Sequence, residues 1–160
     1  MTNAQVRVAR RGEYVDEAAT IWAEATAARD GDPEAAPLDQ ARPVIQAVLD
    51  GSPRSMLLVA LDAGDRVVGF AAVEPGDAAT AEIRYLGVRP DSWGRGVGRH
   101  LLLALPGQLA GAGFVRGELA VYLDNPRAVA LYESAGWSPY GDATPHPRSG
   151  RLEQRYRLDL

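Results

Sequence analysis

The sequence contains no cysteine and only two histidines, His100 and His146, among its 160 residues. Without thiols the chain can form neither a disulfide bond nor a thiolate metal site, and two histidines are too few for a dedicated metal centre. Long apolar runs are also missing. The first residues lack the apolar stretch of a secretory signal, and no segment reaches the ~18 apolar residues of a membrane span. The sequence therefore predicts no metal, no membrane association and a cytoplasmic location.

Basic residues are scarce relative to acidic ones, with 17 Lys and Arg against 21 Asp and Glu. A formal net charge of -4 argues against nucleic acid as a partner, because phosphate backbones recruit basic surfaces. It suits a cationic partner better. Hydrophobic residues make up 46% of the chain, and no repeat or linker divides it, so residues 1–160 are expected to form a single domain.

Hydrophobic periodicity predicts alternating strands and helices along the chain. Strands are expected at residues 5–9 (an edge strand), 55–61, 66–73, 81–88, 115–122, 137–140 and 152–160, the second and third forming a hairpin. Helices are expected at residues 13–29 and 38–49, from about residue 98 to Pro106, where the helix should end or kink, and between Asn125 and Gly136. This order predicts an α/β (α+β) fold with a mixed, mostly antiparallel sheet flanked by helices.

A glycine-rich turn, Gly94-Arg95-Gly96-Val97-Gly98, lies between a predicted strand and a predicted helix. Glycines let the backbone approach a ligand closely, and a helix N-terminus presents unpaired N–H groups to an anion. A nucleotide P-loop would need Lys and then Ser or Thr after the last glycine, where this chain has Arg99 and His100. A dinucleotide fingerprint would need a third glycine in place of Arg99. The turn therefore predicts a diphosphate site of another kind.

Two longer segments resemble the GNAT superfamily of acetyltransferases. Residues 82–102, EIRYLGVRPDSWGRGVGRHLL, resemble its motif A, and residues 119–137, LAVYLDNPRAVALYESAGW, resemble its motif B. The resemblance implies the GNAT acyl-CoA N-acyltransferase fold, with a seven-stranded sheet and about four helices. It also implies transfer of an acetyl group from acetyl-CoA to a primary amine of a small molecule or peptide, by direct attack in a ternary complex. A non-catalytic acyl-CoA-binding or regulatory module stays open as the alternative, and family analogy suggests a homodimer.

The same resemblance assigns residues that bind coenzyme A. The pantetheine arm would pair with the backbone of Leu86, Gly87 and Val88, and the diphosphate would be wrapped by Gly94, Arg95, Gly96, Val97, Gly98 and Arg99. Asn125 matches a family residue that contacts the CoA arm, although it serves equally well as a helix N-cap. Trp93 stands where the family usually has Gln or Arg. The nearby arginines, Arg84, Arg89, Arg95 and Arg99, suit a ligand with several phosphate charges.

For catalysis, the resemblance assigns Tyr132 as the acid that protonates the departing CoA thiolate, a role that an ordinary tyrosine pKa of about 10 permits. Tyr132 also fits an apolar helical stripe and could belong to the core. Glu82 is the first candidate for the general base and Glu118 the second, and an ordered water is a third possibility. Trp22 and Trp137 are expected in the core. His146 is expected in a loop beside the acceptor site, without an assigned role.

Overall fold

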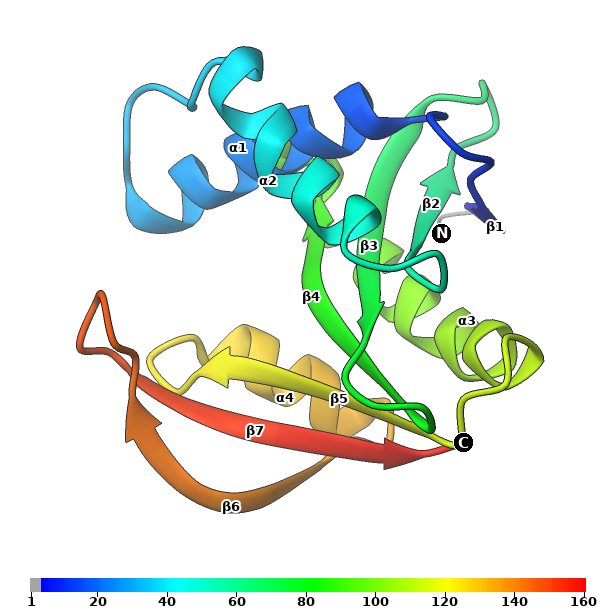
Figure 1. Cartoon of the computed structure of the whole chain (residues 1–160). Coiled ribbons are helices and arrows are strands. Elements are labelled where there is room, and N and C mark those ends of the chain that lie inside the picture. Colours follow the sequence, from blue (N-terminus) through cyan, green and yellow to red (C-terminus); the bar gives the residue numbers. More distant parts are fainter. Residues whose placement is uncertain (1–3) are drawn as a thin grey trace.

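The computed structural model describes residues 4–160, and a seven-stranded sheet organises them (Figure 1). Its strand order is β1-β2-β3-β4-β5-β7-β6. The strands are β1 (Gln5–Val8), β2 (Met56–Leu61), β3 (Val67–Pro75), β4 (Thr80–Val88), β5 (Arg116–Tyr122), β6 (Ser138–Pro145) and β7 (Leu152–Asp159). Neighbouring strands are antiparallel except for β4 and β5, which are parallel. The predicted mixed sheet, the hairpin and the edge position of the first strand are confirmed.

Within residues 4–160, four α-helices cover the two faces of the sheet: α1 (Val15–Asp30), α2 (Leu38–Asp50), α3 (Val97–Gly111) and α4 (Pro126–Ser134). A short 3-10 helix, η1 (Pro90–Ser92), follows β4. Helices α1 and α2 pack against Val59 and Phe70 on one face, and α3 packs against Leu58 and Ala71 on the other. Successive side chains of a strand point to opposite faces, so β2 and β3 must be apolar at nearly every position. The α/β fold predicted from the element order is confirmed.

The sequence predicted that helix α3 would end or kink at Pro106. The helix does not end there but continues to Gly111. Leu105 and Leu109, on either side of the proline, are fully buried against the sheet. Burying each leucine contributes about 1.5–3 kcal/mol, which together offsets the cost of about 3 kcal/mol for a proline inside a helix. Tertiary packing therefore overrides the local signal.

Strand β6 is longer than the predicted strand at residues 137–140, running from Ser138 to Pro145. Its sequence, SPYGDATP, has only one aromatic and one β-branched residue, Tyr140 and Thr144, and contains proline, glycine and aspartate, which are rare in strands. It forms at the sheet edge, where proline is tolerated, because β7 supplies the pairing partner. Trp137, just before it, is 2% exposed and belongs to the core as predicted.

The sheet opens between its two parallel strands. β4 and β5 pair only at Thr80–Arg116, Ala81–Gly117 and Glu82–Glu118. Beyond these pairs β4 stays with β3 as far as Val88, while β5 stays with β7 as far as Tyr122. The facing edges of β4 and β5 are therefore unpaired toward their C-terminal ends, and a wedge opens in the middle of the fold (Figure 1).

None of the helices within residues 4–160 combines the length and the apolar character that a membrane crossing would need.

Candidate active site

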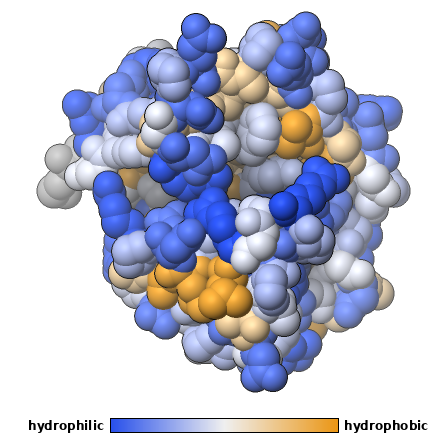
Figure 2. Space-filling model, turned by 90° about the vertical axis from the view of Figure 1, so that its left-hand side faces the viewer, coloured by the Kyte–Doolittle hydropathy of each residue, from blue (hydrophilic) through white to orange (hydrophobic). Residues whose placement is uncertain are grey.

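A cleft of about 1060 Å³ occupies the wedge between β4 and β5. Its walls come from both helical layers, with Trp22, Thr26 and Arg29 from α1 and with Leu131 and Tyr132 from α4. Figure 2, turned so that the left-hand side of Figure 1 faces the viewer, shows strongly hydrophilic side chains gathered across the middle of this face and an apolar patch below them. Because the wedge passes through the sheet, two ligands approaching from opposite faces can meet inside it.

The glycine turn forms the mouth of helix α3. Gly94 and Gly96 adopt left-handed backbone conformations, with φ of 77° and 81°, which side chains other than glycine rarely adopt. Gly96 is the N-cap of α3 and no side chain caps the helix, so its first N–H groups remain available for an anion. Of the six residues predicted to hold a diphosphate, Gly94, Gly96, Val97, Gly98 and Arg99 line the cleft, whereas Arg95 does not.

Trp93 fastens this turn to the end of β4. Its indole Nε1 donates a hydrogen bond of 2.8 Å to the carbonyl oxygen of Val88. Leu86, Gly87 and Val88 all line the cleft, but this bond already occupies the Val88 carbonyl. The tryptophan that departs from the family pattern therefore supports the loop instead of offering a polar group to a phosphate.

The four arginines expected near the phosphates are not gathered in the cleft. Arg84 and Arg99 line it, but Arg89 lies outside and is 3.4 Å from Asp91. Arg127, which was not predicted from the sequence, is an exposed side chain in the first turn of α4 that also lines the cleft. The sequence feature that could have identified it is its position two residues after Asn125, where the helix starts.

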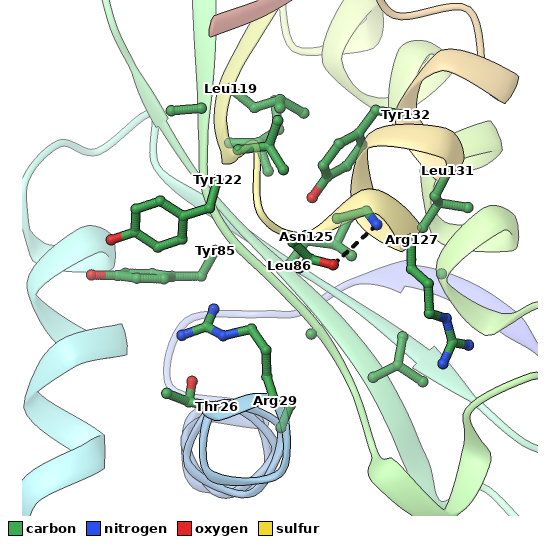
Figure 3. A pocket seen from close by; sticks show the side chains of 18 of the residues that line it. Thr26, Arg29, Tyr85, Leu86, Leu119, Tyr122, Asn125, Arg127, Leu131 and Tyr132 are labelled. Carbon is green, nitrogen blue, oxygen red and sulfur yellow. Dashed lines mark hydrogen bonds between the residues drawn. The ribbon is translucent and has the colours of Figure 1, made fainter. Parts of the chain in front are cut away.

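Tyr132 is half-buried on α4 and lines the cleft, and its hydroxyl points into the open space (Figure 3). Within residues 4–160 this hydroxyl makes no hydrogen bond. Burial raises the pKa of Tyr132 to about 12, because a phenolate loses its hydration there. Tyr132 also packs against the apolar cluster beneath α4, so its ring and its hydroxyl face different surroundings.

Asn125 is the N-cap of α4, as predicted. Its Oδ1 accepts a hydrogen bond of 3.3 Å from the N–H of Ala128, drawn as the dashed line in Figure 3. The residue also lines the cleft, and its contact with the CoA arm stays a prediction.

Glu82 is held in a bidentate ion pair. Arg155 of β7 donates to its two carboxylate oxygens at 2.8 and 2.6 Å and to Glu118 at 3.2 Å. The hydrogen bonds to Glu82 raise the pKa of Arg155 above its usual range. Glu82 lines the cleft whereas Glu118 does not, so a ligand in the cleft can reach only the first of the two. Arg155 was not predicted from the sequence, because no local pattern links it to Glu82, which lies on a strand far away in the chain.

Aromatic side chains from α1, β4 and β5 line the cleft. Trp22 was expected in the core but is only half-buried, lines the cleft and meets Tyr85 edge to face with ring centroids 6.2 Å apart. The helical periodicity placed it correctly on the inward face of α1, where it packs against the apolar cluster and also borders the open wedge. Tyr122 lines the cleft as well and meets His146 edge to face. The Nδ1 of His146 accepts hydrogen bonds from its own loop.

An ionic network ties the β6–β7 loop to the end of α1. Arg151 donates to Asp124 at 2.9 and 2.6 Å, lies 3.8 Å above the Tyr122 ring and is 4.0 Å from Asp30. The hydrogen bonds from Arg151 lower the pKa of Asp124. These contacts connect the two sides of the wedge.

Within residues 4–160, no three His, Asp or Glu side chains come together in a way that could hold a metal ion.

The fold agrees with comparisons against known proteins. A sequence model of the Acetyltransferase (GNAT) family matches residues 17–137. Mycothiol acetyltransferase from Beutenbergia cavernae is 49% identical over 63 residues, which cover 39% of this chain and 21% of that protein. The one from Nocardioides sp. is 37% identical over 95 residues, which cover 53% and 32%. The chain thus matches about a third or less of the length of these curated relatives.

A solved structure extends the likeness to the whole chain. The GCN5-related N-acetyltransferase from Kribbella flavida superposes with a TM-score of 0.74 at 26% identity, over 98% of each chain. The family model covers most of the sequence, and the splayed strands and glycine turn lie within the matched region. The chain therefore belongs to the GNAT acetyltransferase family.

Proposed function

We propose that this chain transfers an acetyl group from acetyl-CoA to a primary amine of a small molecule or peptide, by direct attack in a ternary complex. The supporting observation is the wedge between β4 and β5, which is lined from both faces of the sheet. Donor and acceptor can enter from opposite faces and meet at one point. Holding two reactants in one cleft removes much of the entropic barrier to their reaction.

The donor side of the cleft fits coenzyme A, which the GNAT family uses. The uncapped mouth of α3 would hold the diphosphate through backbone N–H groups, with Arg127 beside it. The unpaired edge of β4 at Leu86 and Gly87 offers backbone groups to the amides of the pantetheine arm, as a neighbouring strand would. Asn125 lines the same part of the cleft.

In the proposed reaction a C–N bond forms as the C–S bond of the thioester breaks. The amine must lose a proton, and Glu82 is the proposed acceptor, directly or through a water molecule. Each oxygen of Glu82 bonds to Arg155, which leaves a second lone pair on each oxygen. Backbone N–H groups near Leu86 would stabilise the negative charge on the carbonyl oxygen. Tyr132, which keeps its proton at neutral pH, would donate it to the departing sulfur.

The curated relatives are named for mycothiol, but this chain matches about a third or less of their length. The proposed acceptor of this chain is therefore not based on theirs.

Two measurements test the proposal. Calorimetry with CoA and with acetyl-CoA should register binding, and release of CoA thiol should follow when a panel of primary amines is added to acetyl-CoA and protein. The chain contains no lysine, so acetylation of its own side-chain amines adds no background. Binding without thiol release for every amine would favour the non-catalytic alternative. Absence of binding at millimolar CoA would overturn both functions.

A further inference from the structure

The charged groups of the cleft are unequally satisfied. Four of its charged side chains belong to pairs that neutralise them: Glu82 and Arg155 pair with each other, Arg29 pairs with Asp30, and Arg84 pairs with Glu74. Glu153 of β7 is half-buried and lines the cleft, and within residues 4–160 its side chain makes no hydrogen bond or ion pair. A half-buried carboxylate without a partner retains an uncompensated negative charge and favours a cation beside it.

A positively charged side chain, that of Arg127, lies at the other end of the cleft. Within the described part of the chain the Arg127 side chain likewise makes no hydrogen bond or ion pair. Figure 3 shows Arg127 and Tyr122 on opposite sides of the cleft. Glu153 pairs directly with Tyr122 across the β5–β7 ladder and shares its face of the sheet. The cleft thus has an arginine without a partner on the Arg127 side and a carboxylate without a partner on the Tyr122 side.

Strand register separates Glu153 from the reacting atoms. Tyr132 packs on the α4 face of β5 with Leu119, whereas Glu153 shares the opposite face with Tyr122. Along β7, Glu153 lies two residues beyond Arg155, the partner of Glu82, which is a distance of about 6.8 Å. Glu153 is therefore placed to hold a part of the acceptor other than the attacking nitrogen.

The neighbouring walls suit a positively charged group on an apolar chain. Trp22 and Tyr85 line the cleft from α1 and β4, and aromatic faces attract cations. Arg29 and Arg151, which both lie near the Tyr122 ring, are each bound to aspartates, and Arg155 is bound to Glu82. Their charge is compensated, so they do not replace Glu153's missing partner.

We propose that Glu153 is a specificity-determining residue that binds a second cationic group of the acceptor. The preferred acceptor is then an amine that carries another positive charge several carbons from the acetylated nitrogen. This inference rests on the proposed acetyl transfer for its kinetic test but not for its binding test.

The kinetic test compares 1,5-diaminopentane with pentylamine, which differ only in the second ammonium group. A charge-assisted hydrogen bond should favour the diamine about 10-fold or more in kcat/KM. Glu153→Gln should abolish this preference and leave the KM for acetyl-CoA unchanged, while Glu153→Asp should retain part of it. Asp159→Asn is the matched control: it removes one charge from the same strand at a side chain that is 86% exposed and outside the cleft, and it should preserve the preference.

The binding test is calorimetry of 1,5-diaminopentane with the protein saturated with CoA. Binding that is weakened about 10-fold by Glu153→Gln but not by Asp159→Asn supports the inference, even if no amine is acetylated and the proposed function fails. Equal preference for diamine and monoamine in the wild type, or an unchanged preference in Glu153→Gln, overturns the inference. Thiol release with both amines would in that case leave the proposed acetyl transfer intact.

Discussion

Two tyrosines in one apolar cluster allow the catalytic role of a tyrosine hydroxyl to be tested separately from a structural role. Tyr132 on α4 and Tyr156 on β7 both contribute to the cluster beneath α4, but only Tyr132 lines the cleft. Only Tyr156 uses its hydroxyl in the fold, donating a hydrogen bond of 3.1 Å to Glu133. Replacing either tyrosine by phenylalanine removes a single oxygen atom, so the two variants differ in what that oxygen does.

Tyr132→Phe should leave stability almost unchanged and reduce turnover strongly. Its hydroxyl has no partner within residues 4–160, so the free energy of unfolding should change by less than about 0.5 kcal/mol. Loss of a general acid typically costs about 10²–10⁴-fold in rate, and kcat should fall within that range. The KM for acetyl-CoA should stay the same, because the proton is needed only as sulfur departs.

Tyr156→Phe should do the reverse. Losing one hydrogen bond at a residue that is 3% exposed should lower the free energy of unfolding by about 1 kcal/mol, or the Tm by about 2–4 °C. Its kcat should match the wild type, because Tyr156 does not line the cleft.

Urea unfolding followed by tryptophan fluorescence and steady-state thiol release would measure both quantities on the same preparations. If Tyr132→Phe kept the wild-type kcat, the acid role would be refuted. If Tyr132→Phe instead lost stability together with turnover, Tyr132 would be a packing residue only.

Three further predictions concern the base, the helix mouth and pH. Glu82→Gln should lower kcat about 10²-fold or more, as measured by thiol release. Glu118→Gln should leave kcat unchanged, because Glu118 also contacts an arginine but does not line the cleft. Gly94→Ala should weaken CoA binding in calorimetry, because a φ of 77° costs any residue other than glycine about 1–2 kcal/mol. Gly107→Ala, in the exposed middle of α3, should instead raise the free energy of unfolding in urea by about 0.5–1 kcal/mol. Because the pKa of Tyr132 is raised to about 12, its hydroxyl is protonated below that value. A pH profile of kcat should therefore show no alkaline fall from Tyr132 up to pH ~10.5. A fall near the ordinary tyrosine pKa of ~10 would contradict the argument that burial raises this pKa.

Much of the fold could be predicted because its signals are local. The alternation of residues 152–160, the helix start at Asn125-Pro126 and the glycines after β4 each act within a few residues, and each produced the expected element. The exceptions were positions where distant partners decide. Pro106 lies inside α3 because the sheet buries the leucines beside it, and β6 forms because β7 pairs with a sequence of low strand propensity.

The site divides in the same way. The glycine turn and the positions of Tyr132 and Asn125 on α4 are properties of contiguous motifs, and sequence sufficed to name them as candidates. The ion pair of Glu82 with Arg155, and the unpartnered carboxylate of Glu153, depend on the register of strands that are far apart in the chain.

The sequence by itself determined the order of the elements and the residues of the helix mouth, because backbone conformation and capping depend on neighbours along the chain. Only the tertiary structure decided where the sheet opens, which of two glutamates faces the cleft, and that Trp22 borders a cavity. Whether a side chain packs, pairs or meets a ligand depends on what the fold brings opposite it, and that information is not carried by any single segment.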